Sequence, residues 1–122
     1  MDERHIINIR NNVDVIMMRT EVRNIARKIG MDMMDQASIS LAASSLAHAL
    51  GLGCTQEGQV MIEQLLDNSR IGLRVICMND NKGETFEIAP KTLQDAQWMV
   101  DELTVETLPT TALRVTLVKW MS

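Results

Sequence analysis

The sequence predicts an α/β two-layer sandwich in which three helices cover one face of a mixed, mostly antiparallel sheet. Three observations lead to this class. Apolar residues recur with strand and helix periods in the order strand, helix, helix, hairpin, helix, hairpin. Turn-forming residues separate these segments, and a length of 122 residues suits a single domain, 1–122, without internal repeats.

The N-terminal segment is expected to form a strand and a long helix. The strand covers 5–10 and ends at Asn11 and Asn12, which form turns and can cap a helix. The helix covers 13–29, and Gly30 is its stop signal. Its buried stripe follows helical spacing and comprises Val15, Met18, Val22, Ile25 and Ile29.

A second helix is expected at 35–51, capped by Asp35 and closed by Gly51. Its apolar face, predicted to lie on the sheet, comprises Ile39, Ala42, Ala43, Leu46 and Leu50. Its other face is small and uncharged where a surface helix usually carries Lys and Glu; it comprises Ser38, Ser45, His48 and Ala49. Two interpretations fit this face: close packing within a small domain, or a pocket or partner that covers it.

The second half of the chain is expected to form two hairpins around a third helix. Asp67 to Arg70 provide the turn of the first hairpin, Thr92 caps the helix, and Pro109 separates the last two strands. The expected segments are the strands 59–66 and 71–78, the helix 92–103, and the strands 104–108 and 112–120.

Composition and charge exclude several functions. A net charge of -4 leaves no overall basic footprint, so we expect neither nucleic acid nor an acidic membrane as partner. Cys54 and Cys77 have no CxxC spacing and no His cluster, which argues against a zinc site or a disulfide scaffold. With no signal-like or membrane-spanning run, the chain is expected to be cytoplasmic.

One basic ridge stands out on the first helix. Arg19, Arg23 and Arg27 follow one another at intervals of four residues and share its exposed side. Such a ridge is either a solvated face or a docking site for an acidic partner.

Three stretches are distinctive: Val-Asp-Val-Ile-Met-Met-Arg from Val13, Asp-Gln-Ala from Asp35 and Gly-Gln-Val-Met-Ile-Glu-Gln from Gly58. They resemble one family, the RsbT-like serine kinases of bacterial stress signalling, which are close relatives of the anti-sigma-factor kinases. The closing Val-Lys-Trp at 118–120 is similar to that family's last strand. The resemblance implies the Bergerat-type (GHKL) ATP-binding fold that histidine kinases share.

The family's catalytic residues do not carry over. Such kinases place a Glu, as base or water-orienting group, and an Asn for Mg²⁺ on the central helix; here these positions correspond to Ser45 and Ala49. A hydroxyl cannot replace a carboxylate base at neutral pH, and a methyl group cannot ligate a hard cation.

The nucleotide-binding segments are also altered. The family's Asp-x-Gly-x-Gly motif, whose Asp binds the adenine amino group, corresponds to Asn79-Asp-Asn-Lys-Gly83, where only Gly83 remains. Asn79 could contact adenine, or a shift of one residue could place Asp80 there. The linker 84–91 contains no Gly, so the family's glycine-rich lid is missing.

The resemblance with these losses predicts a pseudokinase without cofactor or metal that binds proteins in a partner-switching module. Partners implied by the family are a STAS-domain antagonist, a kinase paralogue or the regulatory domain of a phosphatase. Candidate partner-binding residues are Arg19, Arg23, Arg27, Ser45 and His48, although His48 by itself reads as an ordinary surface residue.

Three alternatives stay open. The chain could be an active serine kinase with an atypical site that uses Asn79 or Asp80. It could instead be a structural subunit of a signalling complex, or a homodimer, assembled through Met17 and Met18. A small ligand in the vestigial pocket is the third alternative.

Overall fold

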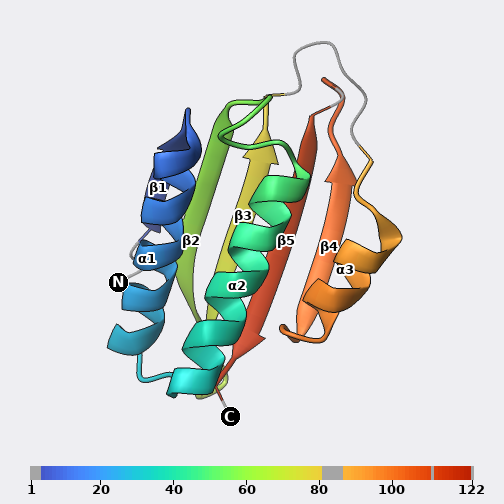
Figure 1. Ribbon diagram of the computed structural model, residues 1–122. Helices are drawn as coiled ribbons and strands as arrows, with labels where there is room; N and C mark the ends of the chain where they lie inside the picture. The colour runs from blue at the N-terminus through green and yellow to red at the C-terminus, as the bar shows by residue number, and fades with distance from the viewer. Residues whose placement is uncertain (1–3, 81–86, 111, 122) are drawn as a thin grey trace.

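The computed structural model describes residues 4–80, 87–110 and 112–121, which form three helices and a five-stranded sheet. The elements are β1 (Arg4–Ile9), α1 (Asn12–Lys28), α2 (Met33–Ala49), β2 (Gly58–Asp67), β3 (Arg70–Asn79), α3 (Pro90–Gln97), β4 (Glu102–Thr107) and β5 (Leu113–Trp120). All three helices lie on one face of the sheet (Figure 1), so the predicted two-layer sandwich is confirmed.

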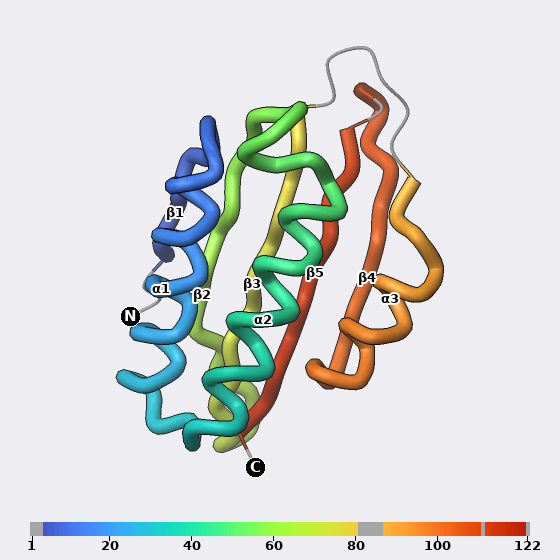
Figure 2. Tube along the Cα trace, in the orientation of Figure 1, coloured from blue at the N-terminus to red at the C-terminus, as the bar shows by residue number. Residues whose placement is uncertain are grey.

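The strand order is β1-β2-β3-β5-β4, and all four pairings are antiparallel, so the sheet is not mixed as predicted. Two successive helices separate β1 from β2 and return the chain to the end of the sheet that β1 reached, which makes β2 antiparallel to β1. A single helix follows β3, but β5 lies between β3 and β4 and pairs antiparallel to both. Figure 2 follows this path along the chain.

Helix α1 begins and ends as its sequence indicates. The Asn11 side chain accepts a hydrogen bond from the Asp14 amide at 3.0 Å, which confirms Asn11 as the cap. Gly30 follows the helix with a φ of 101°, a conformation that favours glycine. The stripe of Val15, Met18, Val22 and Ile25 is buried, and Ile29 is half-buried.

Helix α2 starts earlier than predicted. Its cap is Asp32, whose carboxylate accepts from the Asp35 amide at 2.8 Å, so the prediction of Asp35 as the cap is wrong. Asp35 lies in the first turn, where its carboxylate is 3.6 Å from Lys119 Nζ. The end of the helix agrees with prediction, because Gly51 has a φ of 76° just beyond it.

The sheet-facing side of α2 is the centre of the core. The apolar face predicted for this helix is fully buried, with Ile39, Ala42, Ala43, Leu46 and Leu50 all at 0% exposure. Ser40 and Ser44 are also buried, and each hydroxyl donates to a backbone carbonyl one turn earlier. Small side chains therefore let α2 lie close to the strands without unpaired polar groups at these positions.

The first hairpin matches prediction closely. Asn68 and Ser69 form its two-residue turn with φ values of 47° and 72°, the left-handed conformation typical of such turns. Leu73, Val75 and Cys77 of β3 face the helices and are fully buried. Burial raises the pKa of the Cys77 thiol to about 12, so this thiol stays protonated and serves as a small apolar core residue.

Helix α3 is shorter than predicted. Pro90 occupies its first turn, no side-chain hydrogen bond caps it, and Thr92 lies inside it, so the predicted cap on Thr92 is wrong. The helix stops at Gln97, and Leu103 pairs with Leu117 in the sheet rather than ending the helix. Strand pairing has overridden the helical spacing of the apolar residues at this end.

Removing packing beneath α2 should cost much of the stability. We expect Leu46→Ala to lower the free energy of unfolding by about 2–5 kcal/mol, because Leu46 is fully buried and its loss leaves a cavity. Leu41→Ala in the same helix is the control, and its cost should stay below about 1 kcal/mol because Leu41 is 51% exposed. Urea denaturation measures both; equal losses would contradict the packing described.

Candidate functional site

The positions that the resemblance assigns to nucleotide binding lie at the end of α2 and the end of β3. Asn79, the expected contact to adenine, is 1% exposed at the last position of β3. Its Nδ2 donates to the Leu50 carbonyl at 3.2 Å, and its Oδ1 accepts from the Leu113 amide at 2.9 Å. The Asn79 amide therefore joins the end of α2 to β3 and to the start of β5.

This pairing leaves Asn79 poorly suited to adenine. Each end of the amide holds one backbone partner, and because Asn79 is 1% exposed, a ligand could reach the remaining donor hydrogen or lone pair only if neighbouring residues moved. The alternative residue, Asp80, is exposed and lines a hollow of about 190 Å³ together with Asn8, Arg10 and Glu57. That hollow lies at the ends of β1 and β2, two strands away from β5.

The positions expected to carry catalysis hold no catalytic group. Ser45 and Ala49 are both half-buried in the second half of α2. Neither can act as a carboxylate base or as an oxygen ligand of the kind Asn supplies. Within the described residues, no cluster of three or more His, Cys, Asp or Glu side chains could hold a metal ion. Gly83 and residues 84–86 of the linker 84–91 lie outside the described residues.

The loop after α2 is held by its own hydrogen bonds. The amides of Cys54, Thr55 and Gln56 all donate to the Gly51 carbonyl at 2.9–3.1 Å. A Cβ on Gly53 would lie 2.8 Å from the Asn11 carbonyl oxygen, so only glycine allows the loop to approach the start of α1 this closely. These three amides are turned toward the loop itself rather than presented to a phosphate.

A groove separates α1 from α2 on the side away from the sheet. It has a volume of about 430 Å³ and is lined by Arg19, Thr20, Arg23, Ala37, Ser40 and Leu41. Figure 1 shows α1 and α2, the two helices that line this groove, side by side in front of the strands. The groove therefore combines two guanidinium groups with a floor of small and apolar side chains.

The predicted arginine ridge forms one wall of this groove only in part. Arg19 and Arg23 line it, whereas Arg27 is exposed in the last turn of α1 and contacts Asn24 Oδ1 at 3.4 Å. In the portion of the chain that the structure describes, none of these arginines forms an ion pair. Ser45 and the exposed His48 lie farther along α2 and do not line the groove.

Sequence reasoning identified only some of the exposed apolar side chains on the helices: it singled out Met17 but not Leu41. Met17 is 61% exposed on α1, and Leu41, which lines the groove, is 51% exposed on α2. Met33 and Met34 are exposed at the start of α2. The sequence signal for an exposed apolar site was Leu41, a large apolar residue among small residues on the outer side of α2. Met18, in contrast, is fully buried, so it cannot form an assembly surface with Met17.

Comparisons with known proteins agree with the resemblance. The chain is 32% identical to the serine/threonine-protein kinase RsbT of Bacillus subtilis (strain 168) over 83 residues, which are 68% of this chain and 62% of that kinase. It also matches a solved structure of the RsbU and RsbW domains of a Mycobacterium tuberculosis protein, with a TM-score of 0.67 and 14% identity. That match covers 98% of this chain and 32% of the other. No protein-family model matches the chain.

The structural match defines the class first: the fold is the α/β sandwich found in a protein with an RsbW domain. The sequence match is more specific, and the chain belongs to the RsbT-like family. The chain spans less than two thirds of the length of the RsbT kinase that it matches. No helix in the described parts of the chain is long and apolar enough to cross a membrane.

The Asn79 amide is open to a direct test. We expect Asn79→Asp to lower the free energy of unfolding by about 2–3 kcal/mol at pH 7, because a buried carboxylate cannot donate to the Leu50 carbonyl. Burial raises the pKa of the new carboxyl above its unfolded value. The loss should therefore shrink as the pH falls below that raised pKa and the group takes up a proton.

Urea denaturation between pH 4 and 8 makes this measurement. Asn8→Asp is the control, because Asn8 is exposed on β1 and its substitution should change stability little. A stability of Asn79→Asp equal to that of the parent at pH 7 would contradict the structural role of this amide.

Proposed function

We propose that this chain is a non-catalytic RsbT-like domain that acts by binding protein partners in a bacterial partner-switching module. The candidate partners are a STAS-domain antagonist, a kinase paralogue or the regulatory domain of a phosphatase. The observation that carries the proposal is the buried Asn79 amide, whose two ends are both engaged by backbone groups.

Loss of phosphoryl transfer is supported by the chemistry of the residues present. Transfer depends on positioning the phosphate and neutralising its charge, which requires a metal ligand, a base and backbone donors. Ser45 stands in place of the base, and Ala49 stands in place of the metal ligand. The linker 84–91 has no Gly to supply a flexible lid. Each loss would impair transfer by itself; two of them lie on α2 and the third lies in the linker.

A protein-binding role is supported by the groove between α1 and α2. Among the described residues, Arg19 and Arg23 have no counter-ion, and Leu41, which lines the same groove, provides exposed apolar area. Protein interfaces combine apolar anchors with arginine in this way. A fold can lose one site and keep another surface, so a partner could select this groove without any nucleotide chemistry.

Nucleotide binding separates this proposal from an active kinase. We expect isothermal titration of the protein with ATP and Mg²⁺ to give no binding at micromolar concentrations, because the adenine position is filled by a structural hydrogen-bond network. The RsbT kinase of Bacillus subtilis, titrated under the same conditions, is the positive control. Micromolar binding by this chain would favour the active-kinase alternative.

Restoring two side chains should not restore activity. We expect the double variant Ser45→Glu, Ala49→Asn to leave phosphorylation of a STAS-domain protein undetectable, because the linker 84–91 still lacks glycines and Asn79 remains engaged. Incorporation of labelled phosphate is the measurement. Phosphorylation above the unmodified chain's background would show that the remaining site is competent.

Partner binding should depend on the groove. With a purified STAS-domain protein from the same genome as probe, we expect Arg19→Glu with Arg23→Glu to weaken binding about 10–100-fold, because both arginines line the groove. Lys91→Glu is the matched control, since Lys91 is exposed on α3 away from the groove.

The kinase paralogue and the phosphatase regulatory domain would be titrated in the same way. Failure of all three probes to bind, or equal weakening by the control, would contradict the proposed role of the groove.

A further inference from the structure

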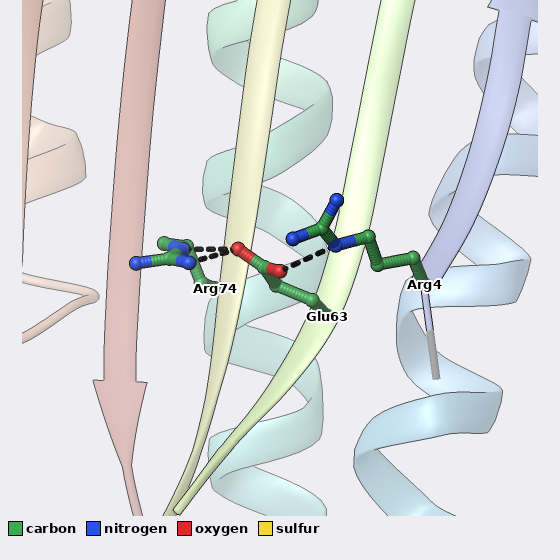
Figure 3. Close-up of polar contacts among 3 residues, drawn as sticks. All are labelled: Arg4, Glu63 and Arg74. Carbon is green, nitrogen blue, oxygen red and sulfur yellow. Dashed lines mark hydrogen bonds and ion pairs between the residues drawn. The ribbon is translucent and has the colours of Figure 1, made fainter. Parts of the chain in front are cut away.

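Arginines on the strands lie beside carboxylates. Figure 3 shows the guanidinium groups of Arg4 and Arg74 directed at the Glu63 carboxylate, with Arg4 Nε 3.3 Å from Glu63 Oε2. The other arginines on the strands are paired as well: Arg70 with Asp67 at 3.2 Å, and Arg114 with Glu106 at 2.9 Å. The charge of each strand arginine is therefore already balanced within the fold.

Arg19 and Arg23 on α1 differ from the strand arginines, because neither forms an ion pair with a described residue. No acidic residue stands three or four positions from either one, so no neighbour along the helix can balance their charge. The two arginines are instead four positions apart, a spacing at which like charges repel. An anion held between them would relieve this repulsion.

The groove between α1 and α2 sets these two charges against an uncharged wall. Its α2 side consists of Ala37, Ser40 and Leu41, and no carboxylate is among the described residues that line it. A cationic ligand would be repelled by the two guanidinium groups, and a neutral ligand would cover them without balancing their charge. The groove therefore suits an anion.

The hydroxyl groups in the groove are already used as donors. Thr20 Oγ1 donates to the Ile16 carbonyl at 3.1 Å, and Ser40 Oγ donates to the Ala37 carbonyl at 3.1 Å. Guanidinium groups thus remain as the lining donors that a ligand can use. Their planar forks match the oxygens of a carboxylate or a phosphate.

The groove is short. Its lining residues run from 19 to 23 on α1 and from 37 to 41 on α2, which is about 6 Å along each helix, or roughly one turn. A docked helix places anchors over about two turns, at i, i+3, i+4 and i+7. A volume of about 430 Å³ over one turn fits one side chain and the backbone beside it rather than a helix.

Two adjacent guanidinium groups match a phosphate better than a carboxylate. A phosphorylated serine or threonine carries about -1.5 to -2 charges at pH 7 and has three acceptor oxygens, enough for two forks at once. A carboxylate carries one charge and is filled by one fork. Leu41, which is 51% exposed in the groove, offers apolar contact to the carbon atoms of the phosphorylated side chain.

We propose that the groove between α1 and α2 binds a phosphorylated serine or threonine side chain of a partner protein, with Arg19 and Arg23 holding the phosphate. This inference rests on the proposed function, because it assigns a chemistry to the partner that the same groove would bind. Phosphorylation of that partner then strengthens its contact with this chain.

A peptide library with a fixed central phosphoserine is the first probe, and the same library with serine is its reference. We expect phosphorylation to tighten binding at least about 10-fold in fluorescence anisotropy, because charge-assisted hydrogen bonds form only with the phosphate. A selected peptide with aspartate in place of phosphoserine should bind less tightly than the phosphorylated form. Absence of any phosphate-dependent peptide would overturn the proposal.

Matched variants on one helix locate the site. Arg19→Gln with Arg23→Gln should weaken binding of the phosphopeptide about 10–100-fold. Arg27→Gln is the control, because Arg27 is exposed on the same ridge but does not line the groove. All three arginines are exposed, so these variants should fold, which circular dichroism checks. Equal weakening by the control, or no weakening by the pair, would overturn the proposal.

The pH dependence separates a phosphate from other anions. The second phosphate pKa is about 6, so binding should strengthen about 3–10-fold between pH 5 and 7.5 as the dianion forms. Arg19 and Arg23 are the titratable groups among the described lining residues, and both stay charged over this range. The peptide with aspartate should show little change, because its carboxyl group is already ionised at pH 5. An equal pH dependence for both peptides would contradict the assignment to phosphate.

Other sources of phosphate are tested in the same assay. Inorganic phosphate, or an RNA oligonucleotide, that binds as tightly as the selected phosphopeptide would overturn the assignment to a protein side chain. The unmodified STAS-domain, kinase-paralogue and phosphatase probes distinguish this inference from the proposed function. If an unmodified probe binds through Arg19 and Arg23 but no phosphopeptide does, the inference fails and the proposed function stands.

Discussion

The buried amide of Asn79 is the interaction on which the relation of α2 to the sheet depends. It satisfies the Leu50 carbonyl beyond the last turn of α2 and the first amide of β5, two backbone groups that would otherwise be buried without partners. Because Asn79 is 1% exposed and each end of its amide holds a backbone group, its structural role competes with nucleotide recognition. The non-catalytic function proposed for this RsbT-like chain follows from that competition.

The two surfaces of the molecule differ in physical character. On the helical side, Arg19 and Arg23 have no counter-ion in the part of the chain that the structure describes, and the exposed Leu41 lines the same groove. On the sheet face opposite the helices, Arg4 and Arg74 flank Glu63, which is almost inaccessible to water (Figure 3). Unpaired charge favours a partner of opposite charge, so the helical side is the better candidate for a charged protein partner.

Much of the architecture could be predicted from local patterns. The number and order of helices and strands, the Asn11 cap and the hairpin turn at Asn68 and Ser69 all follow from residues close in sequence. The predictions were wrong where contacts between distant segments determine the structure. Helix α3 ends early because Leu103 pairs with Leu117 of β5, and β4 lies outside β5, which keeps the sheet antiparallel. No local pattern contains that pairing.

The sequence alone determined which chemistry is unavailable at certain positions. Ser45, Ala49 and a linker 84–91 without glycine limit what those positions can do in any environment, because functional groups belong to residue types. Only the tertiary structure decided which groups are free to act. It buried Asn79 between Leu50 and Leu113, and it opened the groove beside Arg19 by placing α1 against α2. Burial and pairing depend on contacts between distant segments, and these exist only once the chain has folded.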